Sequence, residues 1–156
     1  MAITVSIDLG YEFAVKASYA TVFAELADVP RSASHFPKVD QLVDLGDGAY
    51  RWEMARIGIG SVNLQTVYAS KYVSSKSKGT VVWSPVVGQG NALVSGSWTI
   101  RDQKQSTHLT LQIQGELHLP LPGLMKMVVA PVVEAEFEKM VEQYIANLTR
   151  HFGGEV

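Results

Sequence analysis

The sequence predicts an α+β fold, in which a seven-stranded, curved antiparallel sheet grips a long C-terminal helix and two short helices follow the first strand. Residues 3–15 alternate apolar and polar side chains with the period of two that is typical of a strand with one buried face. Strand and turn signals then run from Lys38 to Leu119, and apolar side chains recur at helical spacing from Ala130 onward. Because the helices are not interleaved with the strands, we expect an antiparallel sheet.

The N-terminal region predicts one long strand and two short helices. The buried face of the strand comprises Ile3, Val5, Ile7, Leu9, Tyr11, Phe13 and Val15. Ser18 is placed to cap a helix whose apolar residues Tyr19, Val22, Phe23 and Leu26 fall on one side. This helix is expected to end near Asp28. A second helical piece covers residues 30–36 and is closed by Pro37.

The middle of the chain predicts six further strands. They cover residues 38–45, 49–57, 61–73, 80–86, 91–100 and 106–119. A turn is expected at Gly46–Gly48 and a turn or bulge at Gly58–Gly60. Gly96 and Gly115 lie inside predicted strands, where a glycine often marks a bend or a bulge.

The C-terminal segment predicts an amphipathic helix that ends at Gly153 and Gly154. Its apolar stripe comprises Val133, Phe137, Met140, Val141, Tyr144 and Leu148, and its polar face includes Glu138, Lys139, Glu142 and Gln143. Pro131 lacks a backbone donor and clashes with the preceding turn, so a kink or a fresh helix start is expected there.

Residues 119–133, LPLPGLMKMVVAPVV, are too apolar for a water-facing surface. The helical part, from Leu124 to Val129, is apolar almost all the way round, so we expect cover on more than one side. Methionine adapts to irregular shapes, and Met125 and Met127 are consistent with a gate at the mouth of a cavity. The alternatives are that the segment fills the core or covers a dimer contact.

Composition narrows the class of protein. Apolar residues make up 47 % of the chain and charged residues 18 %, against roughly 25 % charged in an average domain, which fits a deep core or an apolar pocket. The net charge of −2 is spread along the chain, so no nucleic-acid partner is expected. The chain lacks cysteine and a recognisable signal peptide, so we expect a cytoplasmic protein. No stretch reaches the roughly 20 apolar residues that a membrane span needs, so no stable membrane insertion is expected. We expect one domain, residues 1–156, as a monomer or weak homodimer.

Two strand motifs and the C-terminal segment resemble a known superfamily. Residues 96–100, GSWTI, are similar to its G-x-W-x-aliphatic pattern, and residues 107–111, THLTL, follow the hairpin turn. Together with the proline-rich entry to the last helix, they make the whole chain resemble the START and polyketide cyclase-like (SRPBCC) superfamily, the helix-grip fold. The resemblance implies a sheet wrapped around the terminal helix with a hydrophobic cavity between them. Members include lipid carriers, quinone-binding proteins, aromatic polyketide cyclases and plant allergen-type binding proteins.

Strand parity and the helical stripe together predict which residues bind a ligand. They are Trp52, Met54, Arg56, Leu64, Thr66, Tyr68, Trp83, Trp98, Met125, Val129, Val133 and Phe137. If Arg56 continues the face of Trp52 and Met54, it would pair with a carboxylate or phosphate head group. We favour the alternative, in which the following glycines bend the strand and turn the Arg56 side chain outward. Thr66 and Tyr68 offer hydroxyls either to a ligand carbonyl or to ordinary core hydrogen bonds.

Recognisable catalytic and metal-binding patterns are absent from the sequence. The histidines, His35, His108, His118 and His151, form no H-x-H or H-x-x-x-H pattern, so no metal is predicted. The chain also lacks a G-x-S-x-G nucleophile elbow and a complete dinucleotide fingerprint, so no cofactor is predicted. Glu134, Glu138 and Glu142 stack on the polar face of the last helix, where solvated charges are expected.

The leading hypothesis is therefore the binding, with or without transport, of a hydrophobic small molecule such as a lipid, a quinone or a polyketide-like aromatic. The rival hypothesis is a cyclase or dehydratase-type enzyme, in which Tyr68, Arg56 or His35 moves a proton inside the same cavity. A third hypothesis, a partner-binding module, would use the outer face of the sheet.

Overall fold

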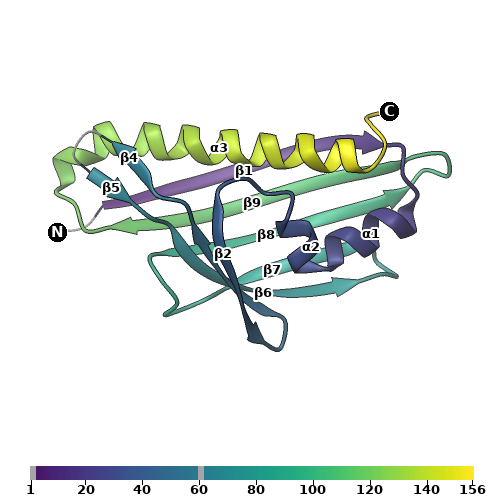
Figure 1. The fold of residues 1–156 in the computed structure, drawn as a ribbon, viewed down its shortest axis with the longest axis horizontal. Helices are drawn as coiled ribbons and strands as arrows, with labels where there is room; N and C mark the ends of the chain where they lie inside the picture. The colour runs from purple at the N-terminus through teal and green to yellow at the C-terminus, as the bar shows by residue number, and fades with distance from the viewer. Residues whose placement is uncertain (1–2, 60–61) are drawn as a thin grey trace.

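The computed structural model describes residues 3–59 and 62–156. Its first elements are β1 (Ile3–Val15), α1 (Tyr19–Ala27) and α2 (Val29–Ala33), and the chain ends in α3 (Lys126–His151) (Figure 1). Between them lie β2 (Val39–Gly46), β3 (Ala49–Met54), β4 (Ile57–Ile59), β5 (Val62–Leu64), β6 (Val67–Ser75), β7 (Thr80–Val86), β8 (Ala92–Asp102) and β9 (Thr107–Leu119).

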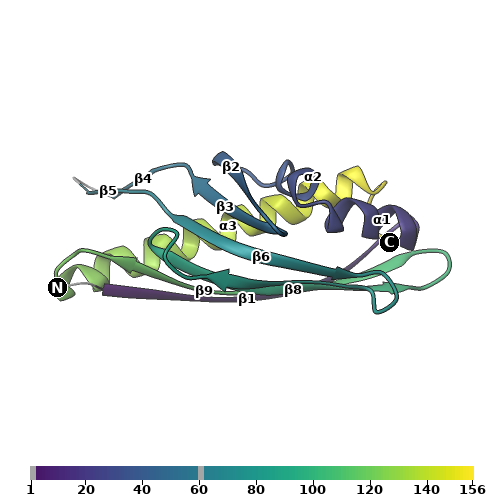
Figure 2. The same cartoon turned by 90° about the horizontal axis from the view of Figure 1, so that it is seen from below.

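Seven of these strands form an antiparallel sheet in the order β1-β9-β8-β7-β6-β3-β2. The sheet curves, so that β2, β3, α1 and α2 lie on the same side as α3 (Figure 2). The helix α3 runs along β1 and β9 and faces the concave side (Figures 1 and 2). This arrangement confirms the predicted α+β fold, with a curved sheet around a long terminal helix and two short helices after the first strand.

Side-chain caps explain why the two short helices begin where they do. The Ser18 hydroxyl accepts a hydrogen bond from the Thr21 amide at 3.3 Å at the start of α1. Asp28 ends α1 and also caps α2, because its carboxylate accepts from the Arg31 amide at 3.3 Å. Pro30 follows in the first turn of α2, where a missing N–H costs no helical hydrogen bond.

The strand predicted over 61–73 is divided into β5 and β6, and β3 ends at Met54 instead of continuing to Ile57. β4 and β5 pair with each other as a separate two-stranded sheet. The side chain of Asn91 accounts for the division, because it donates to the Gln65 carbonyl at 2.8 Å and accepts from the Val67 amide at 2.9 Å. These side-chain bonds replace ladder bonds and end the strands. Gly60, part of the expected turn or bulge, lies outside the described residues.

The terminal helix is one element of 26 residues that runs through Pro131 and follows a 3₁₀ turn over Gly123–Met125. Of the two alternatives expected at Pro131, a kink or a fresh helix start, the fresh start is wrong, because the helix is continuous there. Pro131 lies early in the helix, and the carbonyl that loses its partner belongs to Met127, a residue that is 85 % exposed. The chain end then returns to β1, where the Val156 amide donates to the Ala14 carbonyl at 3.0 Å.

The first turns of α3 are covered on one side only. Val129 is fully buried, whereas Leu124 is 88 % exposed and Val128 is 59 % exposed. The expectation that residues 124–129 have cover on more than one side is not met by the chain itself. Among the described residues, no helix combines the length and the apolar character that crossing a membrane requires.

The core consists of two buried apolar clusters along α3. Val129, Val133 and Met140 pack into the first, and Val141, Tyr144 and Leu148 pack into the second. The helix thus buries its predicted stripe, with Phe137 partly buried against the first cluster.

Candidate ligand-binding cavity

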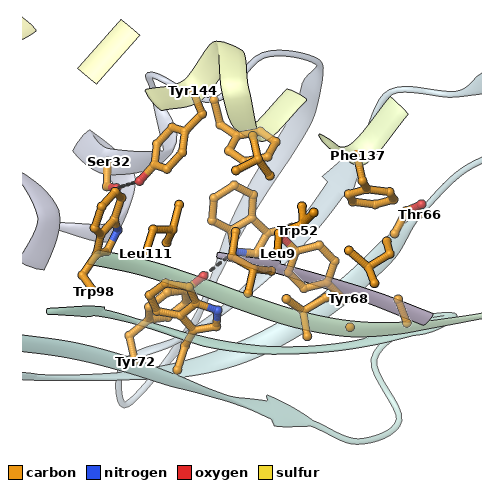
Figure 3. Close-up of a pocket in the computed structure, with 18 of the residues that line it drawn as sticks. Leu9, Ser32, Trp52, Thr66, Tyr68, Tyr72, Trp98, Leu111, Phe137 and Tyr144 are labelled. Atoms are coloured by element: carbon orange, nitrogen blue, oxygen red, sulfur yellow. Dashed lines mark hydrogen bonds between the residues drawn. The ribbon is translucent and has the colours of Figure 1, made fainter. Parts of the chain in front are cut away.

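A cavity of about 80 Å³ lies between the sheet and α3, where the two core clusters meet (Figure 3). Its volume exceeds the roughly 10–15 Å³ that one water molecule requires. The surface is predominantly apolar, and side chains from the sheet, both short helices and α3 contribute to it. Aromatic rings form a large share of the lining: Phe36, Trp52, Tyr68, Tyr72, Trp83, Trp98, Phe137 and Tyr144.

Strand register places the aromatic rings of the sheet beside one another. Trp52 of β3 is the cross-strand partner of Tyr68 of β6, and their rings stack with centroids 5.8 Å apart and planes at 12°. Tyr72 lies on the same face of β6, and it pairs with Trp83 of β7, with ring centroids 5.6 Å apart. The sheet therefore presents a nearly continuous aromatic surface to the cavity.

Tyr144 supplies a hydroxyl from α3 to one end of the cavity (Figure 3). This hydroxyl and that of Ser32 on α2 are 2.5 Å apart, and both are buried. Burial raises the pKa of Tyr144 to about 12, although hydrogen bonds with Ser32 and Trp98 act to lower it. Tyr144 is therefore a neutral phenol at physiological pH.

Two further tyrosines of β6 carry hydroxyls in this buried region. The Tyr72 hydroxyl accepts a hydrogen bond from the Trp52 indole at 2.9 Å, and burial raises the Tyr72 pKa. Burial also raises the pKa of Tyr68 well above its ordinary value. Thr66 and Tyr68 are buried and line the cavity, and neither hydroxyl forms a hydrogen bond with another described residue.

The structure brings together part of the predicted ligand-binding set. The predicted residues that line the cavity are Trp52, Thr66, Tyr68, Trp83, Trp98 and Phe137. Met54, Leu64, Val129 and Val133 are buried in the adjacent first cluster, and Met125 packs against it. Arg56 is exposed and lies outside the lining, because β3 ends at Met54 and Arg56 no longer continues its inward face.

Several lining residues were missed by the sequence prediction. Tyr72 was open to prediction, because it shares the strand parity of Tyr68. Ile7 and Leu9 were assigned to the buried face of β1, although not to a ligand site. Ser32 gave no signal, because a serine in a five-residue helix resembles any capping or surface residue.

A second group of polar residues lies where α1, α2 and α3 meet. Glu25 is buried, His35 lies within 2.7 Å of one of its carboxylate oxygens and His151 within 3.6 Å of the other. Burial acts to raise the pKa of Glu25, but the hydrogen bond with His35 and the charges of His151 and Arg31 outweigh it, so this pKa is lowered. The sequence pattern gave no sign of this group, because His35 and His151 are far apart along the chain, yet their ring centroids are 4.8 Å apart in the fold.

No protein-family model matches the sequence, and no curated protein matches it. Solved structures do match it. A START superfamily protein from Mycobacterium smegmatis is 16 % identical, with a TM-score of 0.64 over 94 % of this chain and 97 % of that one. The Zhui aromatase/cyclase from Streptomyces sp. R1128 is also 16 % identical, with a TM-score of 0.60 over 93 % of this chain and 90 % of that one.

A third similar structure is the di-domain ARO/CYC StfQ from the steffimycin biosynthetic pathway, which is 9 % identical with a TM-score of 0.61. The match covers 96 % of this chain and 51 % of that one. At such identities the likeness shows the fold alone. The chain has a START/polyketide cyclase-like fold. Because a fold does not determine a function, any proposed function must rest on the side chains of the site.

Proposed function

We propose that the protein binds a hydrophobic small molecule with a flat aromatic part in the cavity between the sheet and α3, and that it carries this molecule without transforming it. The observation that supports the proposal is the cavity lined by aromatic rings, with Thr66 and Tyr68 contributing hydroxyl-bearing side chains to its lining. Apolar walls supply affinity, and a few polar groups set the orientation of a ligand. Quinones and polyketide-like aromatics combine flat rings with carbonyl oxygens, and they match this surface better than a simple hydrocarbon chain.

The size of the cavity limits how a ligand enters. A free volume of about 80 Å³ holds only a small group, so a molecule with several rings requires the lining to move apart. Burial of roughly 300 Å² of apolar ligand surface contributes on the order of 7 kcal/mol before the costs of association and of this movement. We therefore expect affinities in the micromolar range at best.

Intrinsic fluorescence tests the proposal directly, because the chain has three tryptophans and all three line the cavity. Titration with a naphthoquinone, an anthraquinone, a flavonoid and a long-chain fatty acid should give a saturable change in emission for at least one of the flat aromatic probes. Free N-acetyltryptophanamide at matched absorbance corrects for collisional quenching and inner-filter effects. The absence of saturation with every probe would contradict the proposal.

A cyclase or dehydratase-type enzyme is the second candidate, because the tyrosines in the cavity lining could contact a substrate there. The raised pKa values of these tyrosines count against it. A general acid works best when its pKa lies near the operating pH, whereas the pKa of Tyr144 is about 12. Tyr144 therefore serves better as a hydrogen-bond donor than as a proton donor, which favours carriage. If the protein converts a poly-β-ketone probe into a cyclised product that has lost water, faster than buffer alone, the function is enzymatic instead.

A further inference from the structure

Glu25, His35 and His151 form a second site, separate from the lining of the cavity. Glu25 lies on α1, His35 just after α2, and His151 at the end of α3. The ligand atoms of the three residues all lie within 4.8 Å of one another. We propose that these residues bind a divalent transition-metal ion of the zinc class.

The geometry of the three side chains is close to that of a metal site. The Nε2 atom of His35 lies 2.7 Å from one Glu25 oxygen, and the Nε2 atom of His151 lies 3.6 Å from the other. A tetrahedral zinc ion with bonds of about 2.0–2.2 Å holds its ligand atoms roughly 3.3 Å apart. Side-chain movements of about an ångström therefore suffice to place all three on one ion.

The ligand types select the class of metal. Two imidazoles and one carboxylate suit zinc and its neighbours in the transition series, whereas magnesium and calcium prefer oxygen ligands throughout. Three protein ligands leave a fourth position for water. Without metal, the short contact between His35 and Glu25 is a hydrogen bond that holds a proton, and the ion would displace that proton.

The surroundings of the site hold its ligands in place and also supply a competitor. The Asn147 side chain donates to the His35 carbonyl at 2.8 Å, which fixes the segment after α2 against α3. The Arg31 guanidinium lies 3.4 Å from the Glu25 oxygen that faces His151, and its side chain is 63 % exposed. Arg31 competes with a cation for the carboxylate, and its exposure allows it to move into solvent when the ion binds.

An ion at this position would join two neighbouring segments, α1 and the residues after α2, to a third that is distant in sequence. It would connect α1 and the segment after α2 to the C-terminal end of α3, close to the contact between Ser32 and Tyr144. Its main effect would be to stabilise the closed arrangement of the helices. The inference is independent of the ligand that the cavity binds.

The test uses the full chain without a polyhistidine tag, stripped of metal. Co²⁺ should give the visible absorption bands of tetrahedral coordination, Zn²⁺ should abolish them by competition, and Zn²⁺ but not Mg²⁺ should raise Tm. His151→Gln should weaken Zn²⁺ binding by at least roughly tenfold and remove the Co²⁺ bands. His118→Gln is the matched control, because His118 is an exposed histidine of β9, and it should leave both unchanged.

Two further variants sharpen the test. Arg31→Gln should tighten Zn²⁺ binding several-fold, because it removes the competing cation from Glu25. His35→Gln should lose binding as His151→Gln does, so the result does not depend on one variant remaining folded. Equal affinity for Zn²⁺ in the wild type and in both histidine variants would overturn the proposal, as would the absence of tetrahedral Co²⁺ bands in both the wild type and Arg31→Gln.

Discussion

Gly96 shows how a single residue makes room for the aromatic lining. A Cβ atom at this position would lie 2.6 Å from the Trp83 indole and 2.3 Å from the Gln112 carbonyl oxygen. The sequence marked Gly96 as the site of a bend or bulge, but β8 pairs with β9 there without a register shift. The structure gives a different reason for this glycine, because only a residue without a side chain lets Trp83 lie flat over β8.

Gly96→Ala should therefore destabilise the protein by about 1–3 kcal/mol, the usual cost of overpacking a rigid interior. Gly10→Ala is the matched control within the same sheet, because a Cβ there would meet only the Leu111 carbonyl oxygen, at 4.0 Å. Urea denaturation followed by circular dichroism measures both free energies of unfolding. Equal stabilities of the two variants would contradict the role assigned to Gly96.

At the scale of single residues, the sequence predicted the members of the cavity that follow strand parity. Trp52 and Tyr68 were found because their alternation is regular within one strand. Ser32 and His151 were not identified as site residues, because each meets its partners only through the packing of helices from different parts of the chain. Spacing along a sequence carries no information about such contacts.

At the scale of elements, two adjacent valines of α3 separate its buried face from its exposed face. Val133 is 1 % exposed and Val132 is 36 % exposed. Val133→Ala should cost about 2 kcal/mol, from lost apolar burial and the cavity left behind, and Val132→Ala should change stability by less than about 0.5 kcal/mol. Any gain from the higher helix propensity of alanine is the same for both and cancels in the comparison.

Thermal or urea unfolding of the two alanine variants checks this difference. A destabilisation of Val132→Ala as large as that of Val133→Ala would show that the exposed face of the helix is covered by something other than this chain, such as a second copy. Repeating the measurement over a hundredfold range of protein concentration separates these cases, because a contact between copies makes stability depend on concentration.

The sequence predicted the existence and order of the elements better than their ends. The alternation of β1 and the stripe of α3 are long enough to be unambiguous, and both were identified with the right face buried. The break between β5 and β6 was not identified, because it depends on hydrogen bonds with the side chain of Asn91, which is distant from these strands in sequence. The sequence left two alternatives open at Pro131, a kink or a fresh helix start, because a proline removes one helical hydrogen bond without determining whether the helix continues past it.

For the molecule as a whole, the cavity results from the way the sheet packs against α3. A substitution that fills the cavity should therefore remove ligand binding without unfolding the protein. Val94 of β8 lines the cavity, and Val94→Phe would place a ring in the free volume. We expect unchanged or slightly raised stability and at least roughly tenfold weaker binding of the flat aromatic probes. Val82→Phe is the matched control, because Val82 is 46 % exposed on the neighbouring strand β7.

Tryptophan fluorescence and a thermal melt of the two phenylalanine variants provide the readout. Binding by Val94→Phe at wild-type affinity would place the ligand somewhere other than this cavity. Loss of binding in Val82→Phe alone would point to the outer face of the sheet, where a partner-binding module would make its contacts.

Because the chain end returns to β1, the C-terminal end of α3 is held by more contacts than its N-terminal end. Beyond α3, the Lys16 amide donates to the Gly154 carbonyl and the Ala17 amide donates to the Phe152 carbonyl, both at 3.1 Å, and Phe152 is buried. At the opposite end, the 3₁₀ turn at Gly123–Met125 contains no buried residue. Any separation of α3 from the sheet should therefore begin at the N-terminal end of the helix, while these backbone hydrogen bonds hold the C-terminal end against β1.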